Sequence, residues 1–304
     1  MYYGCYDAMA LGIYDRITAS TDRVINYKED MFPGCNSFTM VGTNYTFDSE
    51  LLMKTDVKAV LGAGNQDRYD RLKEIGIDVL MVKGSGQSAS GIDVISSIIT
   101  LGTLCSCEEA AQKYADYFDG VAAYIEENAK KLTKEYTYVM PYNPDSLVEN
   151  TVDTKNPSGS MLGDVYAMSL LPMNDLIVSD NGSCPVIQTE DIMKKNPDFI
   201  VVSLVASLSA LDDPDEVQKI FDEKFALYEK TDAYANGKMF GISYDSMGTT
   251  LGIGTLPLLC SMMWPDIFDE ATAWNYFKES IDNFTELKYT DITKCGGLIV
   301  YGMS

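Results

Sequence analysis

Apolar runs bounded by polar turns alternate with amphipathic stretches along the first third of the chain. Residues 57–61 and 77–82 are two such runs, typical of buried strands, and residues 66–76 between them favour a helix that ends at Gly76. A strand, a helix and a strand joined by short loops predict a mainly parallel sheet with helices on its faces.

The same alternation extends toward the amino end. We predict a short strand at residues 2–4, a helix at 6–12 and a strand at 16–20. A further helix begins near Asp48 or Ser49, because the side-chain oxygen of either residue can accept a hydrogen bond from a free backbone N–H of the first turn.

The longest helical pattern covers residues 106–132. Ser106 can cap this helix, Glu108 and Glu109 suit the positive end of its dipole, and two lysines suit its last turn. At ~1.5 Å per residue the helix would be roughly 40 Å long. We therefore expect it to connect two domains.

The alternation of strands and helices resumes after this helix. Strands are expected at residues 136–142, 175–179, 198–204 and 238–244, and helices near 161–171, 189–196, 214–230, 250–264 and 269–281.

An internal similarity supports two lobes of related design. "SELLMKTDVKAVL" begins at Ser49 and "TEDIMKKNPDFIV" at Thr189, and in each a hydroxyl residue and a glutamate precede a Met-Lys pair, a polar turn and a β run. We predict an N-terminal α/β lobe over 1–105, an inter-lobe helix over 106–133 and a C-terminal α/β lobe with closing helices over 134–304.

Composition restricts the functions that fit this architecture. The net charge of −22 disfavours a nucleic-acid partner, because phosphate binding needs a basic surface. Histidine is absent, which excludes Ser-His-Asp and Cys-His catalysis and His-ligated metal sites. All four arginines lie before residue 72. The longest apolar runs are much shorter than the ~20 residues that cross a bilayer.

The seven cysteines are scattered without a CxxC pair. This spacing favours buried free thiols over a metal site, and one or two disulfides remain open if the protein is exported.

The glycine-rich turn after residues 57–61 is not a phosphate loop. Gly62 and Gly64 give GxG, but Asp67 stands at the third glycine position, where its charge would repel a phosphate, and no Lys-Ser/Thr pair follows. The glycine-rich stretch at 84–91 likewise does not match a phosphate-binding loop. Because ligands of open α/β sheets bind outside the carboxyl ends of the strands, we interpret the turn as the rim of another kind of cleft.

Four stretches in this order resemble the substrate-binding proteins of bacterial ABC importers for iron–siderophore complexes, haem and vitamin B12. They are "VKAVLGAGNQDRYDRLKEIGIDVLMV" from residue 57, "EDIMKKNPDFIVV" from 190, "AYANGKMFGIS" from 233 and "WPDIF" from 264. The first is similar to the family's "PDLVI…GN…L…GI.V" stretch and the second to its "E.LL..NPD.IIV" stretch. The resemblance covers nearly the whole chain.

The resemblance implies two Rossmann-like lobes joined by one long helix, with a ligand cleft between them. It implies a monomeric solute-binding component without catalysis and without a resident cofactor or metal, which captures an iron chelate or a corrinoid and delivers it to a membrane permease. Such a protein works outside the cytoplasm, as a cell-surface lipoprotein or in the periplasm. We expect the leader that this location implies to lie outside the sequence given.

Residues at the ends of the predicted strands are the candidate ligand contacts, because they lie at the cleft edge of each lobe. Several are tyrosines, which offer a flat apolar face and a polar tip. The candidates are Tyr3, Tyr6, Asn44, Tyr45, Gly62, Gly64, Asn65, Lys83 and Ser85 in the first lobe and Ser203, Ser207 and Tyr244 in the second.

The resemblance also implies one docking carboxylate on each lobe for arginines of the permease. Asp67 matches the position in the first lobe, where the family usually has Glu. In the second lobe the matching position falls near the uncharged Ser246, so we assign the neighbouring Asp245.

Two other classes of function stay open. One is a two-lobed α/β enzyme, such as a nucleotide-sugar transferase or a metal-cluster oxidoreductase, and the other is an acidic surface adhesin on the same fold. Within the binding-protein hypothesis, we expect a neutral hydroxamate–iron complex or cobalamin, because the second half of the chain offers only lysines to a tri-anionic catecholate chelate.

Overall fold

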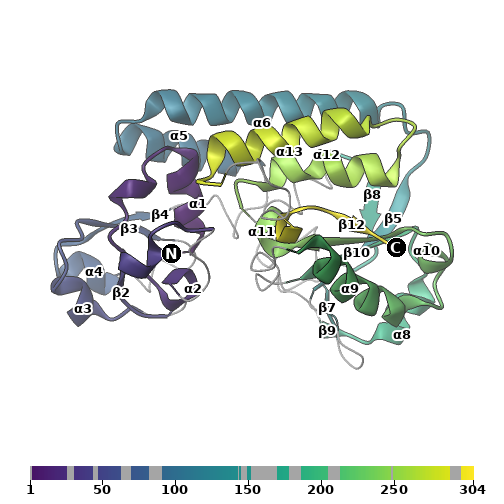
Figure 1. Cartoon of the computed structure of the whole chain (residues 1–304), viewed down its shortest axis with the longest axis horizontal. Coiled ribbons are helices and arrows are strands. Elements are labelled where there is room, and N and C mark those ends of the chain that lie inside the picture. The colour runs from purple at the N-terminus through teal and green to yellow at the C-terminus, as the bar shows by residue number, and fades with distance from the viewer. Residues whose placement is uncertain are drawn as a thin grey trace.

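The computed structural model describes residues 2–25, 31–43, 47–62, 70–81, 91–142, 144, 149–151, 170–177, 186–204, 213–247, 249–287 and 296–304. Two α/β lobes lie side by side beneath a layer of helices (Figure 1). We call α5 (Gly91–Leu104), α6 (Glu108–Ala129), α12 (Gly252–Met263) and α13 (Glu270–Phe284) the helical layer.

The first lobe holds two separate pairs of parallel strands. β1 pairs with β2, and β3 pairs with β4. Its elements are α1 (Tyr2–Ala10), β1 (Ala19–Ser20), α2 (Asp22–Ile25), β2 (Thr39–Met40), α3 (Ser49–Met53), β3 (Ala59–Gly62), α4 (Asp70–Glu74) and β4 (Asp78–Met81), with short 3-10 helices at Tyr14–Arg16 and Cys35–Ser37.

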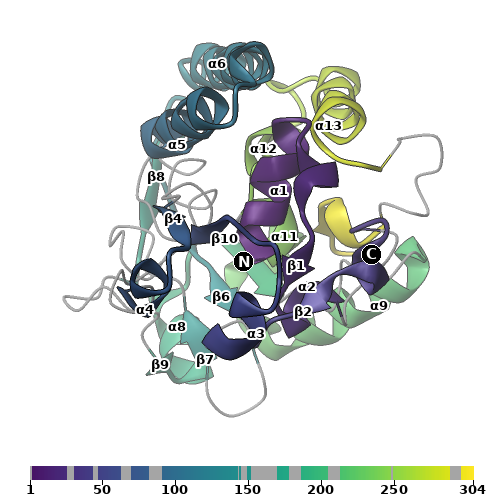
Figure 2. The ribbon, with the colours of Figure 1, turned by 90° about the vertical axis from the view of Figure 1, so that its left-hand side faces the viewer.

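The strand predicted at residues 2–4 is wrong, because α1 already begins at Tyr2. Residues 4–11 are all buried, and α1 packs against α6 and α13 of the helical layer. Figure 2 shows it between α5 and α6 on one side and α13 on the other. A helix buried on every side carries apolar residues all round, so its sequence has no helical period to detect.

Asp48 caps α3, and it was one of the two residues predicted to do so. Its carboxylate oxygen accepts hydrogen bonds from the backbone N–H groups of Glu50 at 2.9 Å and Leu51 at 3.0 Å. The helix at Thr189–Lys195, α8, is likewise followed by a strand. Both halves of the internal similarity therefore form a helix, a turn and a strand.

The long helix of the sequence analysis is continuous over Glu108–Ala129 as α6. Ser106 does not cap it: its φ is +57°, and Cys107 stands at the N-cap without a side-chain hydrogen bond. No helix was predicted at 91–104, where α5 lies. That segment is rich in Ile and Thr, which favour strands, but it packs along α6, where Gly102 leaves room for the side chain of Ala111.

Two tyrosines of α6 connect it to α13 and to the residues just before α12. The Tyr114 hydroxyl donates to the carbonyl of Thr250, and the Tyr117 hydroxyl donates to the carbonyl of Tyr276, each at 2.8 Å. Both rings lie against Phe284, with centroids 5.1 and 5.0 Å away. Gly254 of α12 permits this contact, since a Cβ there would collide with the Tyr117 hydroxyl and lie 2.6 Å from the Cβ of Ser280.

The second lobe is built on one sheet of eight strands among the described residues, with β10 at its centre. β10 pairs in parallel with β5, β6 and β11, and all six of its residues are buried, as expected for a central strand of a parallel sheet. The lobe's elements are β5 (Tyr136–Val139), β6 (Pro141–Tyr142), β7 (Glu149–Thr151), β8 (Met173–Asp175), β9 (Val186–Ile187), α8 (Thr189–Lys195), β10 (Phe199–Leu204), α9 (Pro214–Phe225), a 3-10 turn (Ala226–Tyr228), α10 (Asp232–Ala235), β11 (Met239–Ser243), α11 (Tyr244–Met247) and β12 (Tyr301–Gly302).

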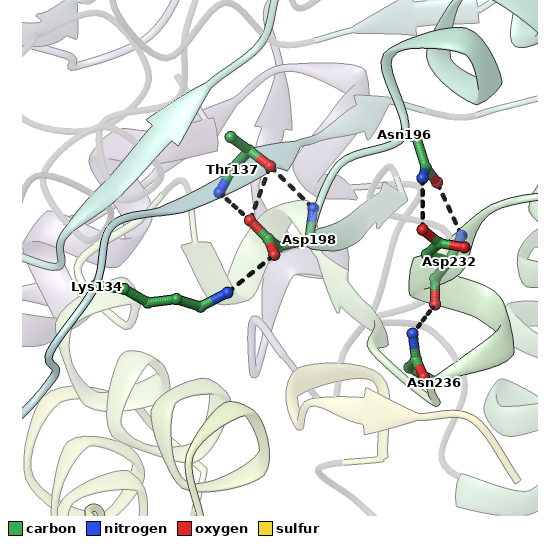
Figure 3. Close-up of polar contacts among 6 residues, drawn as sticks. All are labelled: Lys134, Thr137, Asn196, Asp198, Asp232 and Asn236. Carbon is green, nitrogen blue, oxygen red and sulfur yellow. Dashed lines mark hydrogen bonds and ion pairs between the residues drawn. The ribbon is translucent and has the colours of Figure 1, made fainter.

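The residues "NPD" at 196–198 form the turn between α8 and β10, and Asn196 and Asp198 each make hydrogen bonds there (Figure 3). Asn196 ends α8 in the left-handed conformation, with φ +44°, and exchanges hydrogen bonds of 2.7 and 2.8 Å with Asp232. The carboxylate of Asp198 accepts from the backbone and hydroxyl of Thr137, at 2.8 and 3.0 Å, and lies 3.3 Å from the ammonium of Lys134. These contacts join β10 to β5.

Among the helices of the described residues, none combines the length and the apolar character needed to cross a bilayer.

The contact between α6 and α12 is tested by two glycine substitutions. We expect Gly254→Ala to destabilise the protein by about 1–3 kcal/mol, because the added methyl group has no space beside Tyr117 and Ser280. Gly120→Ala is the matched control: Gly120 lies in the interior of α6, and a Cβ there meets nothing within 4 Å. We expect it to stabilise the helix by about 0.5–1 kcal/mol.

Urea unfolding followed by circular dichroism measures both changes. Equal and small effects of the two substitutions would mean that α12 moves aside at little cost and that the close approach of the helices is not a constraint.

Candidate functional site

The carboxyl ends of β10 and β11 form the edge of the second lobe where a ligand is expected. The two strands are parallel and in register, with Leu204 opposite Ser243. α11 follows β11 without a break, and Figure 1 places it on the side of the second lobe that faces the first lobe. In open α/β sheets this edge is the usual place of ligand contacts.

A cluster of small polar side chains is buried at this edge. Ser203 and Ser246 have no exposed surface, and Ser243 is 1% exposed. The hydroxyls of Ser243 and Ser246 lie 2.7 Å apart, and the Ser246 hydroxyl donates to the carbonyl of Leu298 at 2.7 Å. Ser203 is one of the ligand contacts predicted from the sequence. Its place in β10 fits that edge, but its full burial puts it beneath the surface.

Asp245 lies in the same cluster and is also fully buried. Neither of its carboxylate oxygens has a hydrogen-bond partner in the described part of the chain. Burial raises the pKa of Asp245 to about 8, because the charged form has lost its water. Near neutral pH the side chain is therefore mostly an uncharged acid, which can donate a hydrogen bond as well as accept one.

The assignment of Asp245 to a permease docking surface does not fit this structure. A carboxylate that pairs with a cation of a partner must be exposed and charged, whereas Asp245 is buried and its ionised form is disfavoured. The sequence placed it next to the expected docking position but gave no signal that α11 turns this side chain inward.

Tyr6 belongs to the core of the first lobe. It has no exposed surface, and its ring packs edge-on against Phe32 at 5.4 Å. Burial raises the pKa of its hydroxyl. Tyr6 lies in a helix, as predicted, but residues 4–11 of that segment are all buried, so Tyr6 faces the interior and not a cleft.

Three other candidates are placed only by their backbone. Gly62 is the last residue of β3, at the carboxyl end where it was expected. Tyr244 opens α11, and Tyr3 lies in the first turn of α1. The remaining candidates lie outside the described residues: Asn44, Tyr45, Gly64, Asn65, Asp67, Lys83, Ser85 and Ser207.

Among the described residues, no group of three or more acidic or cysteine side chains is placed to hold a metal ion. Five of the seven cysteines lie in this part of the chain, and all five are free thiols: Cys5, Cys35, Cys105, Cys107 and Cys260.

The state of Asp245 is tested by the pH dependence of stability. Its proton is bound more tightly in the folded protein, at a pKa of about 8, than in the unfolded chain, whose carboxyl group has the ordinary value of 3.8. Between these values stability falls as the pH rises, on the order of 1 kcal/mol per pH unit. Asp245→Asn removes this loss, so we expect the variant to lose less stability than the wild type between pH 5 and pH 8.

Urea unfolding at both pH values gives the free energy of unfolding of each protein. The other carboxylates contribute equally to both, so their contributions cancel in the difference. Identical pH slopes would show that Asp245 is charged at neutral pH in the folded protein.

No protein-family model and no curated protein matches this sequence. Solved structures do match the fold. Superposition on the TroA-like periplasmic binding protein FepB of Veillonella parvula gives a TM-score of 0.72 at 14% identity, covering 100% of this chain and 91% of that one.

Two further structures extend this similarity. The periplasmic vitamin B12 binding protein BtuF of Vibrio cholerae has a TM-score of 0.67 at 14% identity, covering 86% of this chain and 94% of its own. The siderophore binding protein FhuD of Vibrio cholerae, bound to Fe3+-Desferal, has a TM-score of 0.58 at 15% identity, with 88% and 94% covered. The chain has the two-lobed fold of the TroA-like periplasmic binding proteins.

Proposed function

We propose that this protein is the solute-binding component of an ABC importer and works outside the cytoplasm. The observation that carries the proposal is the match of the entire chain, lobes and helical layer together, to a periplasmic binding protein over 91% of that protein's length. Another structural match is the substrate-binding protein of an ABC transporter from Listeria monocytogenes, at a TM-score of 0.54.

The helical layer supports a binding protein whose lobes move little. α6 is hydrogen-bonded to Thr250 and Tyr276, which belong to the second half of the chain, while α1 of the first lobe packs on both α6 and α13. Several packed helices, rather than loose strands, thus link the lobes. A packed helical link permits small sliding motions but opposes a wide hinge.

The chemistry of the second lobe favours a ligand without a strong negative charge. No arginine occurs after residue 71, and the protein has a net charge of −22. The acid at the sheet edge, Asp245, is mostly neutral at pH 7 because of its burial. We therefore propose a neutral hydroxamate–iron complex or a corrinoid as the ligand class, in line with the Fe3+-Desferal of FhuD and the vitamin B12 of BtuF.

We propose that the ligand lies between the strand ends of the two lobes. The residues proposed to contact it are Tyr3, Asn44, Tyr45, Gly62, Gly64, Asn65, Lys83 and Ser85 from the first lobe and Ser207 and Tyr244 from the second. Ser203 and Asp245 are buried below the strand ends of the second lobe and do not themselves contact the ligand.

Ligand binding is tested by thermal melting and visible absorption with three probes: ferrioxamine, cobalamin and haem. A probe present at 100 times its Kd stabilises the protein by about 2.7 kcal/mol and raises the melting temperature. We expect ferrioxamine or cobalamin to raise it, and the bound probe to colour the protein after gel filtration. No shift and no colour with any of the three would contradict the proposed ligand class.

Tyr244 provides a sharper test once a probe binds. We expect Tyr244→Ala to weaken binding by about 1–3 kcal/mol if the ring is a central aromatic anchor. Tyr234→Ala is the matched control, because Tyr234 lies in α10 on the far side of the second lobe in Figure 1. Equal affinities of the two folded variants would remove Tyr244 from the site.

Docking on the permease is tested at Asp67, the proposed docking carboxylate of the first lobe. Asp67→Asn is expected to leave probe affinity unchanged and to lower transport in cells that carry the cognate permease, because paired charges fix the register of such a complex. Asp70→Asn is the control, since Asp70 is exposed at the start of α4 three residues later. Loss of probe binding in Asp67→Asn, or equal transport by both variants, would contradict the docking role.

A further inference from the structure

Residues 296–304 lie along β11 and reach α11, and we call them the C-terminal strap. β12 of this strap pairs antiparallel with β11, with Gly302 opposite Phe240 and Tyr301 opposite Gly241. Because β12 runs opposite to β11, the residues that precede it lie toward the carboxyl end of β11, where α11 begins. Figure 1 shows the strap in yellow beside α11.

The far end of the strap is anchored on α9. The carbonyl of Gly302 accepts a hydrogen bond from the side-chain amide of Gln218 at 2.8 Å, and the Ser304 hydroxyl donates to the carboxylate of Asp222 at 2.7 Å. Neither contact involves α11, so this end of the strap has its own attachment to the lobe.

At its near end the strap is hydrogen-bonded to α11. The Ser246 hydroxyl donates to the carbonyl of Leu298 at 2.7 Å. Since a hydroxyl has one hydrogen, the contact of 2.7 Å between Ser243 and Ser246 uses the Ser243 hydroxyl as the donor. The Ser243 oxygen in turn accepts from the backbone N–H of Ser246 at 3.2 Å. One network thus joins β11, α11 and the strap.

This network is closed to water. Ser246 has no exposed surface, and Ser243 and Leu298 are each 1% exposed. Loss of the Ser246 hydroxyl would leave the carbonyl of Leu298 without its donor and the hydroxyl of Ser243 without its acceptor. Buried polar groups that lose their partners are costly, so a single side chain controls both connections of the network.

α11 depends on such contacts because it is very short. It has four residues, Tyr244–Met247, and a helix of this length is not stable by itself. It packs on β11 and α12, and Ser246 adds the hydrogen bond to a segment 52 residues further along the chain.

We propose that the C-terminal strap is a positioning element for ligand binding and that Ser246 is the positioning residue through which it acts. The strap fixes α11, and with it the backbone of Tyr244, at the carboxyl end of β11. A contact that is already in place before binding loses less conformational freedom when the ligand binds. The role in binding rests on the ligand contact proposed above for Tyr244, whereas the hold of the strap on α11 does not.

Hydrogen exchange followed by mass spectrometry tests this hold without any ligand. Ser246→Ala removes the hydroxyl, and we expect exchange at least about tenfold faster in peptides that cover 243–247 and 298–301, with no change at 199–204. Ser261→Ala is the matched control, because Ser261 is a buried serine of α12 whose hydroxyl donates to the carbonyl of Leu258 within the same helix.

Gln218→Ala gives a second test that leaves α11 itself intact. It releases the strap from α9, so we expect faster exchange at 298–302 and, through the strap, at 243–247 as well. This variant decides alone if Ser246→Ala does not fold. Exchange at 243–247 that stays at the level of the Ser261→Ala control, in either folded variant, would overturn the proposal.

A double-mutant cycle tests the link to the ligand. We expect Ser246→Ala to weaken binding of ferrioxamine or cobalamin at least about fivefold in the wild type but by less than about twofold in the Tyr244→Ala background. Equal weakening in both backgrounds would overturn the positioning role. If the wild type binds neither probe, the proposed ligand class fails, and the exchange measurements still decide whether the strap holds α11.

Discussion

The packing of α6 on α12, where Tyr117 lies over Gly254, holds the two lobes in one arrangement. The contact requires a residue without a Cβ on α12 and a hydroxyl on α6 that reaches the carbonyl of Tyr276. α1 of the first lobe then packs against α6 and α13 together. The relative position of the strand ends in the two lobes depends on this helical layer, and so does any site that both lobes share.

The centre of the second lobe's sheet is fully buried. β10 lies between parallel neighbours with all six residues buried, and Asp198 joins its start to β5 through Thr137. Although burial acts to raise it, hydrogen bonds from Thr137 and the ammonium of Lys134 hold the pKa of Asp198 below its ordinary value. At the opposite edge of the sheet, in α11 after β11, Asp245 has no hydrogen-bond donor in the described part of the chain, and burial alone raises its pKa. Two aspartates of one lobe thus differ in charge, because Asp245 is fully buried without donors, whereas Asp198 is partly exposed and has them.

Much of the fold could be predicted from the sequence, because the periodic segments are long and are bounded by capping and turn residues. The helix from Glu108, the cap at Asp48 and the repeated helix–turn–strand units are examples. α1 was mistaken in part for a strand and α5 was missed, because burial on all sides and β-branched residues hide the helical period. The site was harder to predict from the sequence. Gly62 and Ser203 do lie at the carboxyl ends of their strands, as predicted. Whether Tyr6 and Asp245 face inward depends on packing between segments that are distant in the sequence.

The small separate core of the first lobe has a consequence for how the protein unfolds. Among the described residues, the unit of α3, β3, α4 and β4 shares a cluster of five buried side chains, whereas α6 belongs to the same cluster as the second lobe's sheet. A molecule divided in this way does not lose its structure in one cooperative step. We expect the unit around β3 to open first, so that a protease cuts there while the second lobe and α6 remain as a resistant fragment.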